Sequence, residues 1–265
     1  MSTRQYITYE LDGPLALIGI DRPDKRNAIS AMVMTQLRAA VVRAGEEADV
    51  GIIFGHGDHF SAGLDLAETA RNMAAGDPQP KKRYRRPSHE TLDIVARGPI
   101  PFVVALKGAV VGLGLEMASA AHIRVADETS YFGLPEGQRG IFVGGGGSVR
   151  IQRIIGYSRM CDMMLTGRIM PAVDAERIGL AQYLVPTGQA LEKAKEIALK
   201  ISKNAPMSNW AITNVLPRMG DIDHNDALFV EELASAVVRS PASLERLNAF
   251  VEKRAAPLAV PGRPA

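Results

Sequence analysis

Two glycine-containing turns of this sequence can present backbone N–H groups to a ligand. The first, residues 60–66, follows a strand-like run and precedes a helix-like stretch. At such a turn the first N–H groups of the helix lack intrahelical acceptors and point outward. The small residues Ser61, Ala62 and Gly63 let a ligand approach this backbone closely. A turn packed for structural reasons alone is the alternative, and this segment by itself does not separate the two.

A second turn of the same kind lies at residues 107–116, where Gly112 and Gly114 open another helix. Glu116 falls in the first turn of that helix, among apolar neighbours. A carboxylate there either interacts with the helix dipole, which is worth about 0.3–1 kcal/mol, or serves as a functional group in an apolar pocket. The segment alone favours the dipole interpretation.

Two further candidates follow along the chain. Glu136 lies in a loop after a short strand, with apolar residues before it. Loop glutamates are usually solvated, so the position alone says little. Residues 144–148 form a glycine cluster at the start of a helical stretch. Phosphate could bind there, although the Lys-Ser/Thr ending of a P-loop is absent.

The elements that must position these residues alternate between strand and helix. Residues 6–11 and 15–20 flank Asp12-Gly13, which is a strong hairpin signal. Ser30 can cap a helix whose apolar residues recur at helical spacing. Further elements are predicted as a helix at about 112–121 and as short strands at 50–54, 102–106, 123–126 and 130–132. This alternation over the first two-thirds of the chain predicts an α/β fold.

The last third is predicted to be mainly helical. Residues 190–254 are expected to form three helices whose apolar stripes, for example Leu228, Leu233 and Val237, need a surface to pack on. That surface is either the same domain or a neighbouring subunit. Between the two turns, the loop at 74–88 carries a basic run at 81–86. The run is predicted to be a solvated loop, and the alternative is that its cations meet the phosphates of a ligand.

The composition limits the class of protein. The 265 residues include 46% hydrophobic and 23% charged residues, which predicts a sizeable core. A net charge of +2 gives no indication of nucleic acid or a membrane surface as a partner. No apolar run reaches the ~20 residues that span a bilayer. The polar N-terminus shows no signal peptide, so we expect a cytoplasmic protein.

The histidines and the cysteine do not predict a metal site. His56 and His59 lie near the first turn, but no third ligand is evident. The single cysteine, Cys161, excludes an internal disulfide or a thiolate cluster and fits a reducing compartment. Cys161 and His122 are therefore interpreted as packing or structural residues.

The order and spacing of these segments resemble the enoyl-coenzyme A hydratase/isomerase (crotonase) family over most of the chain. The matching motifs are RPDKRNA at 22–28, SAGLD at 61–65, GLGLE at 112–116, FGLPE at 132–136, LTGR at 165–168 and AERIGLA at 175–181. The resemblance implies an α/β fold built as a spiral of ββα units. It also implies a core, residues 1–190, that contains the active site. The remaining region, residues 191–265, would be helical, cover the active site and build trimers or dimers of trimers.

Roles for individual residues also follow from the resemblance. The backbone N–H groups of Leu64 and Leu113 would form an oxyanion hole for a thioester carbonyl. Glu116 would act as a base toward water, and Glu136 would deliver a proton to C2. The substrate would be an acyl-coenzyme A, so neither a separate cofactor nor a metal is expected. Its binding path would be lined by Lys25, Arg26, Ala28, Ala62, Asp65 and Leu66.

The presence of both glutamates implies an enoyl-coenzyme A hydratase, which adds water reversibly to a 2,3-trans-enoyl thioester. Alternatives in the family are an isomerase, a thioester hydrolase, a decarboxylase and a hydratase-lyase for aromatic enoyl thioesters. A catalytically idle acyl-coenzyme A binding or assembly subunit is a different class, and two carboxyls in an apolar pocket argue against it. Phe142 and Val143 replace part of the family's usual Gly-Ile-Pro-Gly-like turn, which leaves the acyl group of the substrate open.

Overall fold

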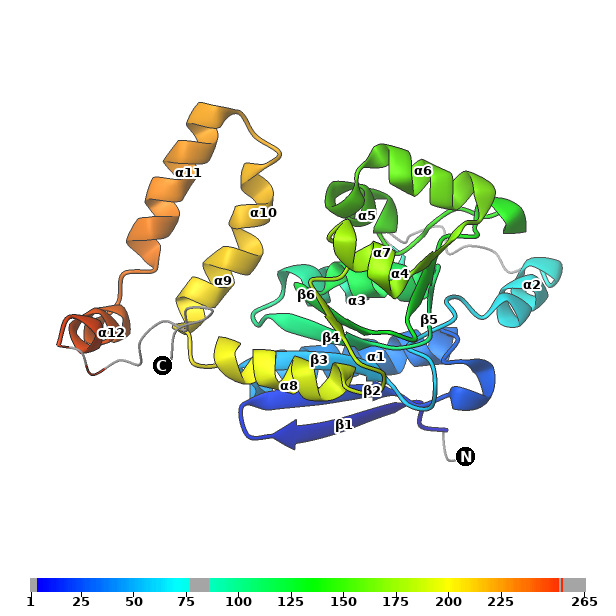
Figure 1. Ribbon diagram of the computed structural model, residues 1–265, viewed down its shortest axis with the longest axis horizontal. Coiled ribbons are helices and arrows are strands. Elements are labelled where there is room, and N and C mark those ends of the chain that lie inside the picture. The colour runs from blue at the N-terminus through cyan, green and yellow to red at the C-terminus, as the bar shows by residue number, and fades with distance from the viewer. Residues whose placement is uncertain (1–3, 77–85, 253, 255–265) are drawn as a thin grey trace. The chain divides into compact units, whose positions relative to one another are not determined.

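The computed structural model describes residues 4–76, 86–252 and 254. The chain forms two compact units, Met1–Lys203 and Asn204–Ala265 (Figure 1). The basic run at 81–86 lies outside the described residues except for Arg86, so neither interpretation of that run is tested.

The first unit is built on a six-stranded sheet in the order β1-β2-β3-β4-β6-β9. The predicted hairpin is confirmed: β1 (Ile7–Asp12) and β2 (Leu15–Ile20) pair antiparallel around Gly13, whose φ is +58°. The other neighbours pair in parallel. They are β3 (Val50–Gly55), β4 (Phe102–Leu106), β6 (Ile123–Asp127) and β9 (Tyr183–Val185). Parallel strands need crossover connections, which here carry the helices.

Helices cover both faces of this sheet. Helix α1 (Ala31–Glu47) begins at Ser30, whose side chain accepts a hydrogen bond from the Val33 N–H at 3.2 Å, as predicted. Along β2, Ala16, Ile18 and Ile20 belong to the core cluster that includes α1. Leu15 and Leu17 belong to a second cluster, with residues of α8 (Ala190–Ile201). The alternation is the period-2 pattern of a strand buried on both faces.

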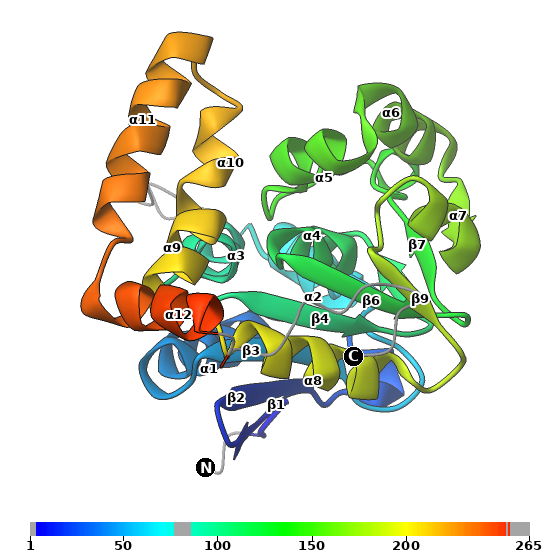
Figure 2. The ribbon, with the colours of Figure 1, turned by 60° about the vertical axis from the view of Figure 1, so that its left-hand side comes forward.

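A second, three-stranded sheet lies next to the start of α4 (Leu113–Ala120). Its order is β5-β7-β8, with β5 (Ala109–Val111) parallel to β7 (Tyr131–Gly133) and β7 antiparallel to β8 (Ile169–Pro171). Every residue of α4 is buried, and α3 (Pro87–Arg97) and α5 (Gly147–Ile155) pack against it. Figure 1 and Figure 2 show α4 and α8 on opposite sides of β4.

Short elements complete the first unit. They are two 3-10 helices, η1 (Pro23–Lys25) and η2 (Gly137–Arg139), and the α-helices α2 (Leu66–Ala74), α6 (Tyr157–Thr166) and α7 (Ala172–Arg177). None of the helices in the described part of the chain is long and apolar enough to cross a membrane.

The second unit contains α9 (Pro206–Asn214), α10 (Leu216–Met219), α11 (His224–Val237) and α12 (Pro241–Val251). Residues 190–252 therefore hold five helices rather than the three expected, because prolines near the first positions of α9, α10 and α12 start new helices there. The structural boundary also follows α8 instead of preceding it, because the apolar face of α8 completes the core of the first unit. Assembly through the C-terminal helices remains a prediction.

Candidate active site

A cavity of about 270 Å³ lies in the first unit, beside the small sheet and the start of α4. Two segments that the sequence singled out, the turn at 60–66 and the loop around Glu136, meet at this cavity. Its walls are formed by Arg26, Ala62, Leu64, Leu66, Ala109, Val111, Gly112, Leu113, Tyr131, Pro135, Glu136, Arg139 and Ile141.

Backbone hydrogen bonds bring the two glycine turns side by side. Ser61 pairs with Val110: its N–H donates to the Ala109 carbonyl at 2.9 Å, and its carbonyl accepts from the Val111 N–H at 3.1 Å. On the other side, Ile29 pairs with Leu64 in a second parallel bridge. In that bridge the hydrogen bonds involve residues 63 and 65, so the N–H of Leu64 points away from Ile29.

Gly63 allows close contact between the turns. Its φ is +92°, and a Cβ atom there would lie 2.6 Å from the Val111 carbonyl oxygen and 3.3 Å from the Leu113 nitrogen. Leu113 is the first residue of α4, so its N–H has no intrahelical acceptor. Across the described residues, neither the Leu64 N–H nor the Leu113 N–H donates a hydrogen bond. Two unpaired donors therefore lie on the wall of one cavity.

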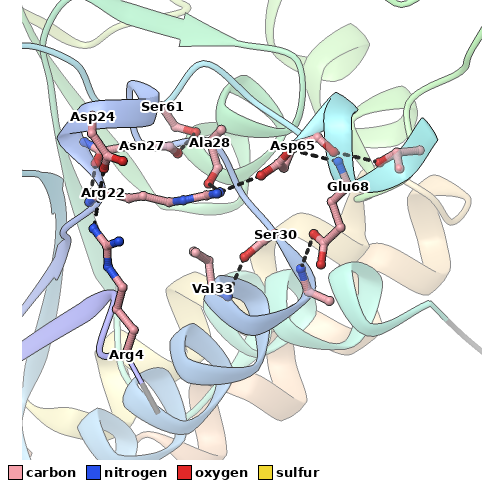
Figure 3. Close-up of polar contacts among 12 residues, drawn as sticks. Arg4, Arg22, Asp24, Asn27, Ala28, Ser30, Val33, Ser61, Asp65 and Glu68 are labelled. Atoms are coloured by element: carbon pink, nitrogen blue, oxygen red, sulfur yellow. Dashed lines mark hydrogen bonds and ion pairs between the residues drawn. The ribbon is translucent and has the colours of Figure 1, made fainter. Parts of the chain in front are cut away.

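Asn27 ties the segment before α1 to the first turn (Figure 3). It is fully buried, and its φ of +56° is unusual for a residue with a side chain. Its side-chain oxygen accepts from the Arg22 N–H at 2.9 Å, and its amide nitrogen donates to the carbonyls of His56 and His59 at 2.9 and 2.6 Å. The Ser61 hydroxyl donates to the Asn27 carbonyl at 2.8 Å. The Asn27 side-chain amide thus joins the segment before α1 to the residues that lead into the turn, and the Asn27 carbonyl contacts the turn itself.

Asp65 is engaged in the same network. Arg22 Nη1 lies 2.8 Å from Asp65 Oδ2 and also donates to the Ala28 carbonyl at 3.0 Å (Figure 3). Asp65 caps α2 by accepting from the Glu68 N–H at 3.0 Å. That hydrogen bond and the Arg22 guanidinium hold the pKa of Asp65 below its usual range. Asp65 and Ala28 are not among the residues that line the cavity.

The predicted binding residues therefore divide into two groups. Arg26, Ala62 and Leu66 line the cavity, as do the two leucines predicted as N–H donors. Lys25 is an exposed residue of η1, and like Ala28 and Asp65 it is not part of the lining. Three further residues, for which the sequence predicted no individual role, also line the cavity: Tyr131, Arg139 and Ile141. Arg139 ends the short helix η2, and the Ile141 N–H just after it donates to the Glu136 carbonyl at 3.1 Å, so both lie close to Glu136 in sequence and in space.

Glu116 is held by the glycine cluster. The residue is 2% exposed, and its Oε2 accepts from the N–H groups of Gly145 and Gly147 at 2.7 and 2.8 Å. Its Oε1 accepts from the Gly144 N–H at 3.2 Å. The cluster that was considered for phosphate thus binds a carboxylate of the chain itself. A carboxylate offers about four acceptor positions, so one on Oε1 is left over. Glu116 itself does not line the cavity, to which the start of α4 contributes Gly112 and Leu113.

Glu136 has a different environment. It lines the cavity and is 5% exposed, and its Oε2 is buried without a hydrogen-bond partner. Burial raises the pKa of Glu136 to about 6, and the negative charge of Glu116 adds to this shift. A Cβ atom on Gly112 would lie 3.0 Å from its Oε1, so the carboxyl lies beside the start of α4. The Glu116 carboxyl therefore accepts three N–H hydrogen bonds, whereas the Glu136 carboxyl is poorly solvated.

The remaining candidates have structural contacts. The Nδ1 atom of His59 accepts from the Ala109 N–H at 3.1 Å, and His56 Nε2 lies 2.9 Å from Thr8 Oγ1. His122 Nδ1 accepts from the Phe102 N–H at 2.9 Å, and burial lowers the pKa of His122 to about 4. Cys161 is a half-buried free thiol. Within the described residues, no three side chains of the metal-binding types come together.

The site thus combines two unpaired backbone N–H donors with two buried carboxyls, on a fold of parallel strands and crossover helices. This combination defines the class of protein. Residues 10–259 match the enoyl-CoA hydratase/isomerase family. The enoyl-CoA hydratase EchA19 of Mycobacterium tuberculosis is 33% identical over 93% of both chains. Among solved structures, a provisionally named enoyl-CoA hydratase of Rhodopseudomonas palustris superposes with a TM-score of 0.84, at 39% identity over 94% of this chain and 95% of that chain. The enoyl-CoA hydratase of Bacillus anthracis gives 0.85, at 29% identity over 94% and 97%.

The chain belongs to the enoyl-CoA hydratase/isomerase family and has the crotonase fold. The expectations of family and fold class are therefore confirmed. The roles of individual site residues remain predictions.

Proposed function

We propose that this protein is an enoyl-CoA hydratase that adds water reversibly, in syn fashion, across the double bond of a 2,3-trans-enoyl-CoA thioester. The observation that carries the proposal is the contrast between two buried carboxyls, Glu116 and Glu136, next to the free N–H groups of Leu64 and Leu113. Where the environments of two carboxyls differ in this way, one is suited to act as base and the other as acid.

The two N–H groups would stabilise the enolate. When water adds at C3, negative charge develops on the thioester oxygen, and donors fixed in a water-poor cavity stabilise that charge without having to reorganise. Loss of one such donor typically costs roughly 3–4 kcal/mol in the barrier. Because the donors belong to the main chain, leucine side chains at both positions are compatible with this role.

The glutamates would move the protons. Glu116, which accepts three N–H hydrogen bonds, has one acceptor position on Oε1 with which to take a proton from water. The resulting hydroxide bonds to C3, and Glu136 transfers its proton to C2 as the enolate collapses. The pKa of about 6 means that a fraction of Glu136 carries a proton near neutral pH. Passage of the proton from Glu116 to Glu136 through solvent restores the starting state.

The coenzyme A part of the substrate would provide the binding energy. Arg26 lines the cavity and, among the described residues, has no acidic partner, so its guanidinium is available to a phosphate. Lys25 is exposed nearby in η1, and Ala62 and Leu66 offer an apolar wall. Ala28 and Asp65 would then support the path through the Arg22 network rather than line it. Coenzyme A enters and leaves as part of the substrate, so the reaction requires no separate cofactor.

Isomerisation of the double bond is a second candidate, and one observation favours it. Glu136 lines the cavity whereas Glu116 does not, and a single carboxyl that moves a proton between two carbons suffices for an isomerase. We also propose that the chain assembles as a trimer or a dimer of trimers through its C-terminal helices, where Leu228, Leu233 and Val237 are exposed in the single chain. Light scattering on the purified protein measures that assembly.

An assay with crotonyl-CoA tests the main proposal. We expect the absorbance of the conjugated enoyl thioester to decrease on addition of the protein, with 3-hydroxybutyryl-CoA as product. Thioesters of graded chain length and an aromatic enoyl thioester define the acyl group. Conversion of 3-butenoyl-CoA to crotonyl-CoA, without hydration of any 2-enoyl thioester, would favour the isomerase instead. No loss of absorbance with any 2-enoyl thioester would rule out the hydratase.

A further inference from the structure

The glycine turn that holds Glu116 is itself held from its other side. Ser88, in the first turn of α3, donates its hydroxyl to the Gly144 carbonyl at 2.7 Å. Arg150 of α5 donates to the carbonyl of the next residue, Gly145. Arg150 also lies 3.5 Å from Asp93 of α3, so α3 and α5 meet across the outer side of the turn.

One peptide group connects Ser88 with Glu116. The carbonyl of Gly144 and the N–H of Gly145 belong to the same planar trans peptide, in which they point in opposite directions. The carbonyl accepts from Ser88, and the N–H donates to Glu116 Oε2 at 2.7 Å. A hydrogen bond to the carbonyl polarises the peptide and strengthens the bond that its N–H makes.

Arg150 restrains the following peptide, between Gly145 and Gly146, through its carbonyl. Its guanidinium holds the Gly145 carbonyl and occupies the space beside Gly146, where a Cβ atom would lie 2.7 Å from Arg150 Nη2. Glycine residues have little intrinsic preference for one backbone conformation. A run of four glycines therefore needs external contacts to keep its N–H groups aimed at one carboxylate.

We propose that Ser88 and Arg150 are positioning residues: they fix the peptides of Gly144 and Gly145 and thereby orient the Glu116 carboxylate. Neither side chain lines the cavity, so both act through the turn rather than on the substrate. The inference rests on the proposed function insofar as Glu116 is taken as the base. The contact itself does not depend on that role.

A double-mutant cycle with Glu116→Gln tests the inference. We expect Ser88→Ala to lower kcat by about 10–100-fold, because a displaced catalytic group loses its alignment, while KM changes by less than about threefold. Ser88→Thr, which keeps the hydroxyl, should recover most of the turnover, and Arg150→Gln should resemble Ser88→Ala. In the Glu116→Gln background Ser88→Ala should cause little further loss, because residues that act through one group are not additive.

A double-mutant cycle measured by thermal unfolding, which we call the stability cycle, tests the link between Ser88 and Glu116 without any assay of activity. We expect Ser88→Ala to lower the thermal midpoint by about 2–4 °C in the wild type and by less in Glu116→Gln. The matched control is Ser202→Ala, which removes a hydroxyl that donates to a backbone carbonyl at the exposed end of α8. Its effect should be the same in both backgrounds.

The two cycles separate the two proposals. A wild-type protein that hydrates no enoyl thioester contradicts the proposed function, and the stability cycle then decides the positioning role alone. Equal midpoint changes for Ser88→Ala in both backgrounds would overturn the positioning role. So would equal losses of kcat in both backgrounds in an active enzyme.

Discussion

Gly63 and Leu113 are so close that a Cβ atom on Gly63 would lie 3.3 Å from the Leu113 amide nitrogen. The same atom would lie 2.6 Å from the Val111 carbonyl oxygen, which is closer than real Cβ atoms come. The separation of the two glycine turns, and with it the separation of the Leu64 and Leu113 N–H groups, therefore depends on the missing side chain.

Gly63→Ala should consequently move the turns apart. We expect a loss of kcat of about 100-fold or more, because a displacement of roughly 1 Å at reacting groups has an effect of that size. Gly179→Ala is the matched control: its φ is +78°, but a Cβ atom there meets nothing within 4 Å. That variant should lose about 1–2 kcal/mol of stability from the left-handed backbone alone and keep its turnover. Similar turnover in the two variants would show that the turn spacing is unimportant.

Substitution of either glutamate should affect the chemical step more than binding. We expect Glu116→Gln and Glu136→Gln each to lower kcat by about 10²–10⁴-fold, the usual contribution of a general acid or base. The dissociation constant of butyryl-CoA, a saturated ligand measured by calorimetry, should change little. Near-normal turnover in either variant would contradict the role proposed for that residue.

The raised pKa of Glu136 predicts a pH-dependent stability. Its ordinary value is 4.5, and burial raises it to about 6, so the folded protein binds more protons than the unfolded chain between these values. The stabilisation that the folded protein gains from protonated Glu136 is fully present below pH 4.5 and is lost as the pH rises through about 6. Glu136→Gln lacks this loss.

Urea unfolding of both proteins from pH 4.5 to pH 8 measures the effect. Relative to the wild type, Glu136→Gln should become progressively more stable over that range. Glu128→Gln, which changes an exposed glutamate one strand away, should show no such trend. If the difference in free energy of unfolding between the wild type and Glu136→Gln does not change with pH, the buried environment assigned to Glu136 is contradicted.

Asn27→Asp should be strongly destabilising although the two side chains have nearly the same shape. The Asn27 amide nitrogen donates to the carbonyls of His56 and His59, and a carboxylate oxygen in its place would face two acceptors. We expect a loss of about 3 kcal/mol or more in the free energy of unfolding, since buried polar groups would lose their partners. Asn72→Asp, on the exposed surface of α2, is the control and should cost less than about 0.5 kcal/mol. Equal stability of the two variants would contradict the role of the Asn27 side chain in joining the segment before α1 to residues 56–59.

The sequence predicted those parts of the fold that depend on local patterns. The hairpin around Gly13, the cap at Ser30 and the buried strand at 102–106 are periodic or have defined turn chemistry, and the structure confirms them. Strands β5 and β8 have three residues each, too few to display a period. The predicted boundary at 190/191 groups α8 with the C-terminal helices, whereas its apolar face packs on the first unit, because an apolar stripe does not indicate which surface it covers.

The sequence predicted those features of the site that depend on a local turn, and not the contacts between residues that are distant in sequence. The turns that contain Leu64 and Leu113 both line one cavity, and their role there remains a prediction. The partners of Glu116 were not predicted, because the N–H groups of residues 144–147 lie about thirty positions further along the chain and become neighbours only after folding. The same holds for Asp65, whose partner Arg22 lies on the other side of α1 in sequence.

The two short bridges, Ser61 with Val110 and Ile29 with Leu64, are made entirely by main-chain atoms. The N–H groups that would face the thioester oxygen are thus positioned by the backbone, whereas Tyr131 and Ile141 form part of the neighbouring wall. Selection, natural or in the laboratory, can therefore exchange wall residues one at a time and change which acyl groups fit. Such exchanges would leave in place the backbone N–H groups of Leu64 and Leu113, which would stabilise the negative charge on the thioester oxygen.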